Sequence, residues 1–268
     1  MIEGWQAEAL NTAPDSANEI HGDDMAQRFG FKGGLVPGVT ISAYLIQPAV
    51  TAWGMDFLTR GAAHVRVTSP LYDGERFQVN ILTQTNDRYE AELIRPDGSV
   101  SASTEVDLPE LAAAPPARKQ DPIVAPDFVG PPASIDMFTR LQQEGCVAYR
   151  HHWGAKHRMQ HYLRDDSLMP EILTGQDACA NMSYLLGISN WILAGNAYMN
   201  PWVHLETTSQ NYGAVPRGTN IIAEMRIVDF FEKKGHEFVD ADVAMFDESD
   251  DACLMTVRLR AIYRLRGS

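Results

Sequence analysis

The chain is poor in cysteine and has no long hydrophobic run. Its 268 residues include three cysteines, Cys146, Cys179 and Cys253, and no two of them form a CxxC pair. Isolated thiols of this kind indicate reduced, inert cysteines and not a disulfide framework. No run approaches the ~20 apolar residues that a membrane-spanning helix needs. Because the N-terminal segment also lacks the basic and apolar regions of a secretory signal, we expect a cytoplasmic protein without a membrane partner.

Positive charge is also scarce. The chain has 22 Lys and Arg residues against 35 Asp and Glu residues, which gives a net charge of -13. Affinity for nucleic acid rests on Lys and Arg, so this balance argues against a nucleic-acid partner. Residues 146–164 break the trend, because they contain no carboxylate and four cations: Arg150, Lys156, Arg158 and Arg164. Such a face suits the phosphates of coenzyme A, or it is a solvated surface that balances Asp165 and Asp166.

The first half of the chain shows one apolar helix followed by strands. The hydrophobic content of 45% and charged content of 21% are typical of a soluble globular protein, with either one large domain or two ordinary ones. A helix is expected over residues 39–54, and Pro48 should bend it or end its first half. Strands are expected at 63–69, 77–84, 88–94 and 99–106, with turn signals between them.

The second half repeats this plan after an Ala- and Pro-rich linker at 109–133. A short helix is expected over 134–144, capped by Ser134 and stopped by Gly145. A second apolar helix is expected over 177–193, followed by strands at 202–210, 220–231, 236–246 and 253–263. The chain is therefore predicted to be α+β, with domains at 1–108 and 134–268. An unrelated pair of α+β domains would show the same order of elements.

Alternation in the first of these later strands groups three conspicuous side chains. Trp202, His204 and Glu206 are spaced by two residues, which places them on one face of a strand. That face could line a ligand tunnel or form the solvent side of a sheet.

Residues 18–38 carry the main functional signal. His21 stands before a short amphipathic segment, a Gly-Phe turn follows, and Pro37-Gly38 precedes the first long helix. This order resembles the hydratase motif of the MaoC-like hot-dog family, which adds or removes water on acyl thioesters. The matching positions are His21, Asp23, Ala26, Gly30, Phe31 and Gly38. The resemblance implies a double hot-dog fold, with one long helix wrapped by an antiparallel sheet in each half, and an (R)-specific enoyl-CoA hydratase or dehydratase that uses neither cofactor nor metal.

Hydration of an enoyl thioester needs a base near the double bond, a donor at the thioester carbonyl, and a dry tunnel. Histidine suits the first role because its pKa lies near neutral pH. The free amides of a helix N-terminus suit the second role. The resemblance implies that His21 and the Gly38 amide face the same thioester, and that a glycine at position 38 lets the thioester approach the backbone. It also places Asn18 in the substrate-binding site.

The sequence departs from the family at Ser16, which stands five residues before His21 where the family has an aspartate. A serine does not take a proton from water near neutral pH, so a strict reading predicts weak or absent hydratase activity. Asp15 could fill the role if the loop absorbs one residue, or a carboxylate of the second half, such as Asp177, could meet His21. We take His21 and Asp15 as the catalytic pair, and Asn18, Gly38 and Ser16 as substrate-binding residues.

Two other functions remain open at this point. A hot-dog acyl-CoA thioesterase would release free thiol, and a carboxylate such as Asp177 would then matter more than His21. A non-catalytic acyl-binding protein is the alternative that the serine at position 16 favours. Hot-dogs expose a long edge strand, so a homodimer is possible, although two hot-dogs in one chain can cover each other.

Overall fold

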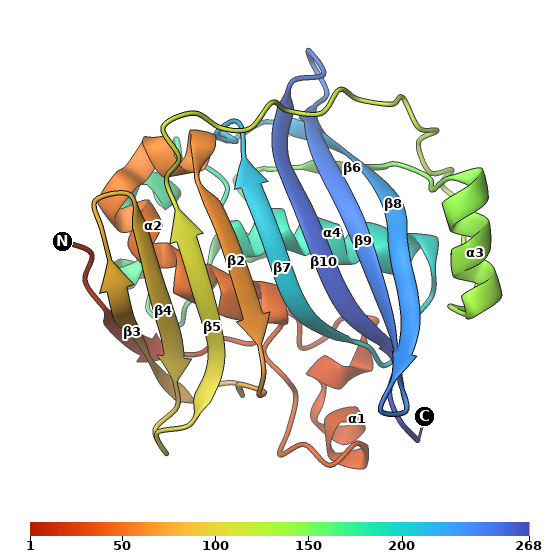
Figure 1. The fold of residues 1–268 in the computed structure, drawn as a ribbon, viewed down its shortest axis with the longest axis horizontal. Helices are drawn as coiled ribbons and strands as arrows, with labels where there is room; N and C mark the ends of the chain where they lie inside the picture. The colour runs from red at the N-terminus through yellow and green to blue at the C-terminus, as the bar shows by residue number, and fades with distance from the viewer. Residues whose placement is uncertain (268) are drawn as a thin grey trace.

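A computed structural model describes residues 1–267, and a single antiparallel sheet dominates it (Figure 1). Within the described chain the sheet has 10 strands in the order β1-β3-β4-β5-β2-β7-β10-β9-β8-β6. The strands of the first half therefore lie on one side and those of the second half on the other, and β2 pairs with β7 where they join. The strands are β1 (Trp5–Glu8), β2 (Ala62–Val67), β3 (Arg76–Gln84), β4 (Arg88–Ile94), β5 (Val100–Asp107), β6 (Tyr149–His152), β7 (Val203–Asn211), β8 (Asn220–Lys233), β9 (His236–Asp247) and β10 (Cys253–Arg264).

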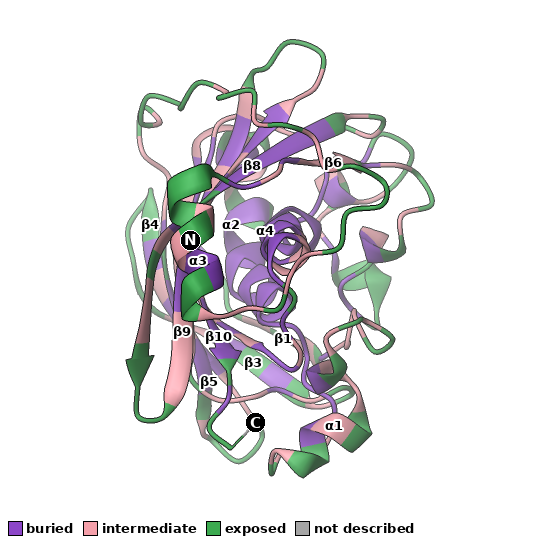
Figure 2. Cartoon of the chain, turned by 90° about the vertical axis from the view of Figure 1, so that its right-hand side faces the viewer, coloured by how far each residue is buried: buried purple, intermediate pink, exposed green. Residues whose placement is uncertain are grey.

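Two apolar helices, α2 (Gly38–Arg60) and α4 (Met182–Asn196), lie against each other inside the curve of this sheet. Figure 2 shows both helices at the centre of the molecule with most of their length buried. The inner face of the sheet and these two helices form one continuous hydrophobic core. The remaining helices are short: η1 (Glu19–His21), α1 (Asp23–Arg28), α3 (Ile135–Glu144), η2 (Arg158–Gln160), η3 (Asp166–Leu168) and η4 (Glu171–Leu173).

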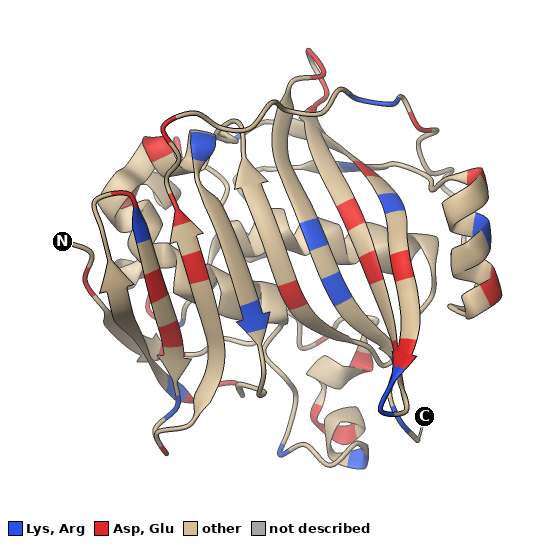
Figure 3. Cartoon of the chain, viewed as in Figure 1, with Lys and Arg blue, Asp and Glu red and all other residues tan. Residues whose placement is uncertain are grey.

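The outer face of the sheet is charged. Figure 3 shows alternating blue and red bands across neighbouring strands, and several of these charges form ion pairs. Asp242 bridges Arg226 and Arg258, with its Oδ2 and Oδ1 each 2.6 Å from a guanidinium nitrogen. A face of this kind is stable in water, so the buried helices mark the inner side as the place for an apolar ligand.

Most of the elements predicted from the sequence are confirmed, and the effect of Pro48 is the clearest error. The helix does not end at Pro48 but continues to Gly54, where a non-helical conformation (φ 49°, ψ -123°) breaks it at the predicted end, and a second helical stretch of α2 runs on to Arg60. A proline removes the N–H that would bond the carbonyl four residues earlier, which is that of Tyr44. Here the indole Nε1 of Trp5 donates to the Tyr44 oxygen over 3.1 Å. The orphaned acceptor is satisfied from outside the helix, so the helix continues.

The second apolar helix starts later than predicted. α4 begins at Met182, not at residue 177, because Asn181 is its N-cap and accepts from the Tyr184 amide over 3.0 Å. The capping side chain fixes an extended conformation just before the helix, at φ -79° and ψ 161°.

Residues 108–134 of the described chain contain no helix or strand and carry the chain from the first half to the second, along one end of the sheet (Figure 1). Glu224 of β8 holds this segment, because its carboxylate accepts from the amides of Lys119 (2.8 Å) and Asp121 (3.1 Å). The predicted helix over 134–144 is confirmed as α3, with Ser134 as its N-cap and Gly145 after its last residue.

The expectation that His204 and Glu206 share a face is wrong. The register of β10 against β7 shifts between Arg260, opposite Glu206, and Ala261, opposite His204. This β-bulge leaves Leu205 as the extra residue and turns the strand between the two side chains. His204 consequently faces inward and is 5% exposed, whereas Glu206 faces outward and pairs with His64 and Arg66.

Candidate functional site

Two apolar pockets meet where the N-terminal loop lies over α4 and β7. The first, here called the α4 pocket, has a volume of about 120 Å³ and is lined mainly by Met159, Gly187, Trp191, Ala194 and Met199. The second, the β7 pocket, has a volume of about 210 Å³ and is lined mainly by Ile20, Leu35, Ile41, Val203, Ile262 and Leu265. Both pockets also include four shared residues: Asn18, His21, Asn190 and Trp202. We call the two pockets together the slot.

His21 is held in one tautomer at this junction. Its Nδ1 lies 2.7 Å from the Leu35 carbonyl oxygen. A carbonyl oxygen only accepts, so Nδ1 carries the proton and Nε2 keeps a lone pair. Burial lowers the pKa of His21 below its ordinary value of 6.5, against the opposing effect of the Leu35 hydrogen bond. The imidazole is therefore neutral near pH 7 and suited to accept a proton.

The motif residues around His21 build the loop that carries it. The Asp23 carboxylate accepts from the Gly34 amide over 2.7 Å, and Asn11 Nδ2 donates to the His21 carbonyl over 2.8 Å. A side chain at position 34 would collide with the His21 carbonyl, so only glycine fits there. The family-like residue Asp23 thus closes the turn that returns Leu35 to the imidazole.

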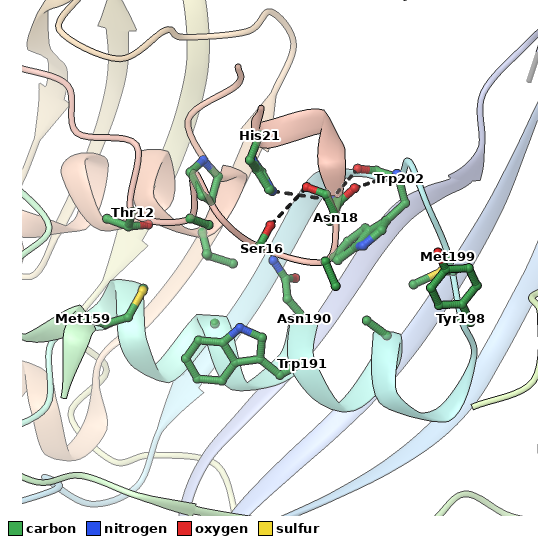
Figure 4. A pocket seen from close by; sticks show the side chains of 16 residues that line it. Thr12, Ser16, Asn18, His21, Met159, Asn190, Trp191, Tyr198, Met199 and Trp202 are labelled. Atoms are coloured by element: carbon green, nitrogen blue, oxygen red, sulfur yellow. Dashed lines mark hydrogen bonds between the residues drawn. The ribbon is translucent and has the colours of Figure 1, made fainter. Parts of the chain in front are cut away.

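Asn18 and Ser16 lie at the slot, but their side chains form hydrogen bonds with other groups of the chain (Figure 4). Asn18 Nδ2 donates to the Trp202 carbonyl over 2.9 Å, and its Oδ1 accepts from the Trp202 amide over 3.1 Å. The same Nδ2 lies 3.4 Å from His21 Nε2. Ser16 Oγ donates to the Asn18 carbonyl over 3.0 Å. Asn18 therefore clamps the N-terminal loop to the second half of the chain and aims a weak donor at the base.

The start of α2 reaches the slot, and Gly38, which the sequence analysis placed at the substrate, lines the β7 pocket. The N-cap of α2, Pro37, has no side chain that can bond the first amides. A Cβ at position 38 would lie 3.0 Å from the His204 carbonyl oxygen and 3.1 Å from its ring. The glycine lets β7 pack closely on α2. The Thr40 amide donates to the Pro37 carbonyl over 2.9 Å, while the amides of Gly38 and Val39, which line the two pockets, have no acceptor among the described residues.

Asn190 is a polar residue of the slot that the sequence analysis missed. Its Oδ1 lies 2.7 Å from His204 Nδ1, so that nitrogen donates, and His204 Nε2 then accepts from the Thr207 hydroxyl over 2.5 Å. Burial lowers the pKa of His204 to about 4, so this ring is neutral. Among the described residues, Asn190 Nδ2 has no acceptor, and Figure 4 shows the side chain rising from α4 toward Asn18 and His21. The sequence signal that could have identified Asn190 is a polar residue within an otherwise apolar predicted helix.

The two carboxylates proposed as partners of His21 lie elsewhere. Asp15 and Asp177 are both exposed, and neither lines the α4 pocket or the β7 pocket. Within residues 1–267 no Asp or Glu lines either pocket. A third, polar hollow that also includes His21 contains Asp23, Asp73 and Glu75, but Asp23 accepts from the Gly34 amide, Asp73 pairs with Arg164, and Glu75 accepts from the Tyr72 amide over 3.1 Å. Acid–base chemistry in the slot would therefore depend on the imidazole.

Other kinds of site find no support in the described residues. No group of three His, Cys, Asp or Glu side chains in residues 1–267 is placed to hold a metal ion. No helix in that part of the chain has both the length and the hydrophobicity needed to cross a bilayer.

By sequence alone, no protein-family model matches the chain and no curated protein matches it. Several solved structures, however, are similar to it in fold. A Chloroflexus aurantiacus protein named as a MaoC domain dehydratase is 10% identical, with 98% of this chain and 95% of that chain covered and a TM-score of 0.59. Rv0216 of Mycobacterium tuberculosis, described as a double hot-dog, is 10% identical over 97% of this chain and 95% of its own, at a TM-score of 0.55.

A tesB protein of Mycobacterium avium subspecies paratuberculosis is also similar, at 12% identity and a TM-score of 0.51, with 87% of this chain and 88% of that chain covered. Similar structures therefore carry different names, one a MaoC domain dehydratase and another a tesB protein. At these identities the likeness is one of fold, and it confirms the predicted fold: the chain is an α+β double hot-dog, with α2 and α4 as its two central helices.

Proposed function

We propose that this protein is a hydratase or dehydratase that acts on the 2,3 double bond of an acyl thioester, with His21 as its single acid–base group. The observation that supports this proposal most strongly is the tautomer of the His21 imidazole. The Leu35 carbonyl fixes the proton on Nδ1, so the lone pair of Nε2 is available at the junction of two apolar pockets.

One imidazole suffices for the reaction because it can both take and return the proton. In hydration, Nε2 accepts a proton from water while the water oxygen bonds to C3 of the enoyl group. The electron pair of the double bond moves toward C1, and negative charge develops on the thioester oxygen. The imidazolium then gives its proton to C2, which completes the addition of water, and dehydration follows the same steps in reverse.

Donors for the thioester oxygen are present on both central helices. Asn190 Nδ2 is uncommitted, and the Gly38 and Val39 amides at the start of α2 have no acceptor among the described residues, whereas the Thr40 amide donates to the Pro37 carbonyl over 2.9 Å. Preorganised donors of this kind stabilise charge that develops in a transition state, and they act more strongly where apolar walls exclude water. Trp191 and Trp202 provide such walls on either side of the polar group.

The direct test is an assay with crotonyl-CoA and longer enoyl-CoA esters, in which absorbance of the conjugated thioester is lost. We expect His21→Ala to lower kcat by about 10²- to 10⁴-fold, which is the usual contribution of a general base. Tyr162→Phe is the matched control, because Tyr162 Oη donates to Gln47 at the opposite end of the helix pair. Equal inactivity of the wild type and His21→Ala on every chain length would end the hydratase proposal.

The pH dependence adds a second readout. Because the pKa of His21 is below 6.5, the neutral base persists at pH 7 and above. We expect kcat/KM to be level there and to fall as the pH drops through this lowered pKa, when Nε2 becomes protonated. A profile that instead falls as the pH rises from 6 to 8 would assign the base role to another group.

Thioester hydrolysis is the second candidate, and because no Asp or Glu of the described chain lines the slot, it would use His21 in place of the carboxylate expected from the sequence. Hydrolysis needs one base and one carbonyl donor. His21 Nε2 would take a proton from water as the oxygen attacks C1, and the departing thiolate would receive that proton. Release of thiol from a saturated acyl-CoA, followed with a thiol-reactive dye, distinguishes this reaction from hydration. Thermal stabilisation by acyl-CoA without any turnover would instead indicate a binding protein.

A further inference from the structure

Three exposed cations gather at the rim of the β7 pocket, where the β8–β9 hairpin meets the C-terminal end of β10. Lys233 ends β8, Lys234 lies in the turn, and Arg266 follows β10. A Cβ on Gly235 would lie 3.2 Å from Arg266 Cδ, and the Arg266 amide donates to His236 Nδ1 over 3.1 Å. We call Lys233, Lys234 and Arg266 the hairpin cation cluster.

The hairpin cation cluster lies next to the slot, because residues adjacent to it in sequence line the β7 pocket. His236 and Leu265, which flank it, both line the β7 pocket, and the same pocket includes His21 at its other limit. Lys234 and Gly235 both have positive φ, 55° and 78°, which is the geometry of a tight two-residue hairpin. The hairpin therefore presents its lysines from a defined position, and Figure 3 shows this blue tip beside the C-terminus.

The charge of the cluster is not cancelled locally. Arg264 pairs with Glu237 at 2.7 Å, which leaves Glu232 as the nearby acid in the hairpin. Across residues 1–267, none of the three cluster cations forms an ion pair with an acidic side chain. A surplus of positive charge on a protein with a net charge of -13 favours a small anionic group.

The basic segment singled out in the sequence is less suited to this role. Arg150 pairs with Glu248 at 2.6 Å, and Arg164 pairs with Asp73, so two of its four cations are already neutralised. Lys156 and Arg158 remain exposed and supply a natural comparison for the hairpin cluster.

We propose that the hairpin cation cluster binds the phosphates of coenzyme A, and that the pantetheine arm enters through the β7 pocket. This inference rests on the proposed acyl-thioester function, and it names the carrier and the direction in which it binds. A coenzyme A ester has a long arm that ends in a diphosphate and a 3′-phosphate. The β7 pocket takes the arm, the cluster takes the phosphates, and the acyl group then occupies the α4 pocket against Trp191.

The test compares ligands with and without phosphates on wild-type protein and charge-reversal variants. The unreactive thioethers S-butyl-coenzyme A and S-butyl-pantetheine are titrated calorimetrically. For the variant K233E/K234E we expect at least about a tenfold loss of affinity for the coenzyme A ligand, since each reversed charge replaces attraction by repulsion. Affinity for the pantetheine ligand should not change. The control K156E/R158E makes the same change in net charge and should bind both ligands like the wild type.

The outcomes separate the inference from the function it rests on. If K233E/K234E binds S-butyl-coenzyme A as tightly as the wild type, or if K156E/R158E loses that binding instead, the hairpin is not the phosphate site. Wild-type protein that binds the pantetheine ligand as tightly as the coenzyme A ligand also overturns the inference, while the acyl-thioester function stands. Wild-type protein that binds neither ligand and turns over no thioester removes both.

Discussion

The two central helices begin in opposite ways. At the start of α4, Asn181 accepts from the Tyr184 amide (3.0 Å) and its own Nδ2 donates to the Met159 carbonyl (2.7 Å). At the start of α2, Pro37 offers no side-chain cap, and Gly38 lines the β7 pocket. Unsatisfied amides at a helix start must find a partner in water or in a ligand. The third amide is satisfied at both starts, by the Asn181 side chain in α4 and by the Pro37 carbonyl in α2, where the Thr40 amide donates over 2.9 Å. What differs is the surroundings, because the first two residues of α2 line the slot and those of α4 do not.

The side chains beside these helix starts differ in the same way. Near α4, Tyr162 Oη donates to Gln47 Oε1 over 2.7 Å, and Gln47 Nε2 donates to the Leu168 carbonyl over 3.0 Å. Near α2, the only contact of His21 Nε2 among the described residues is the long one from Asn18 Nδ2 at 3.4 Å, and Asn190 keeps a free Nδ2. We call the first arrangement the closed end and the second the open end. Among the described residues, Tyr184 Oη in the first turn of α4 also lacks a partner, but Tyr184 lines neither pocket, so the free donors that reach the slot are at the open end.

The difference between the open and closed ends is tested most directly by removing one polar side chain from each end and comparing the effects on kcat and on stability. We expect Asn190→Ala to lower kcat by about 10²- to 10³-fold, the usual effect of losing a donor to a developing oxyanion. Gln47→Ala should lower the free energy of unfolding by about 1–3 kcal/mol, because it leaves buried partners unsatisfied, without a comparable loss of kcat. Steady-state kinetics and urea unfolding on both variants measure the two effects. Equal kcat losses would mean that the closed end also takes part.

The ends should also differ in how they respond to acid. His204 at the open end has a pKa of about 4 in the folded protein, whereas its unfolded value is 6.5. The unfolded state therefore binds the proton first, so the stability due to this group is complete above pH 6.5 and is lost as the pH falls toward 4. The loss amounts to about 3 kcal/mol.

Urea unfolding of the wild type and His204→Gln between pH 7 and pH 4 isolates this contribution. The variant should show a shallower fall of the free energy of unfolding with decreasing pH. Tyr162→Phe at the closed end should keep the wild-type slope, because burial raises the pKa of Tyr162 and its hydroxyl stays protonated throughout this range. Parallel slopes in the wild type and His204→Gln would contradict the assignment of a neutral buried ring.

The smallest expected effect concerns the cap of α4. Asn181→Ala should lower the free energy of unfolding by about 1–2 kcal/mol, as the loss of an N-cap usually does, and should leave kcat within about twofold. Asn181→Ser, which keeps a capping oxygen, is the conservative control and should recover part of the stability. A large fall in kcat for Asn181→Ala at unchanged stability would mean that the closed end is functional after all.

Local pattern was sufficient for most of the fold and for locating His21 as a candidate. Alternation and turn residues located the long strands, and apolar runs located both central helices, because these signals depend on neighbours in sequence. The resemblance around His21 also led to the slot. Ser16, Asn18 and His21 lie together there, as the motif implied, while their roles toward a substrate stay predictions.

The errors came from contacts between distant residues. Pro48 is tolerated because Trp5 bonds the carbonyl that it orphans. His204 turns inward because a bulge shifts β7 against β10, and that bulge is a property of strand pairing. Asp15 stays exposed one residue before a serine that lines the slot, which spacing alone did not reveal.

By itself, then, the sequence determined an α+β chain with two apolar helices, each followed by antiparallel strands, and a histidine placed before the first of these helices. The tertiary structure decided which helix start is open, which asparagine faces the histidine, and that no carboxylate of the described chain lines the slot. The reason is physical. Helix and strand periodicity arise from adjacent residues, whereas the protonation state and partners of a buried imidazole depend on groups that only the folded chain brings within hydrogen-bonding distance.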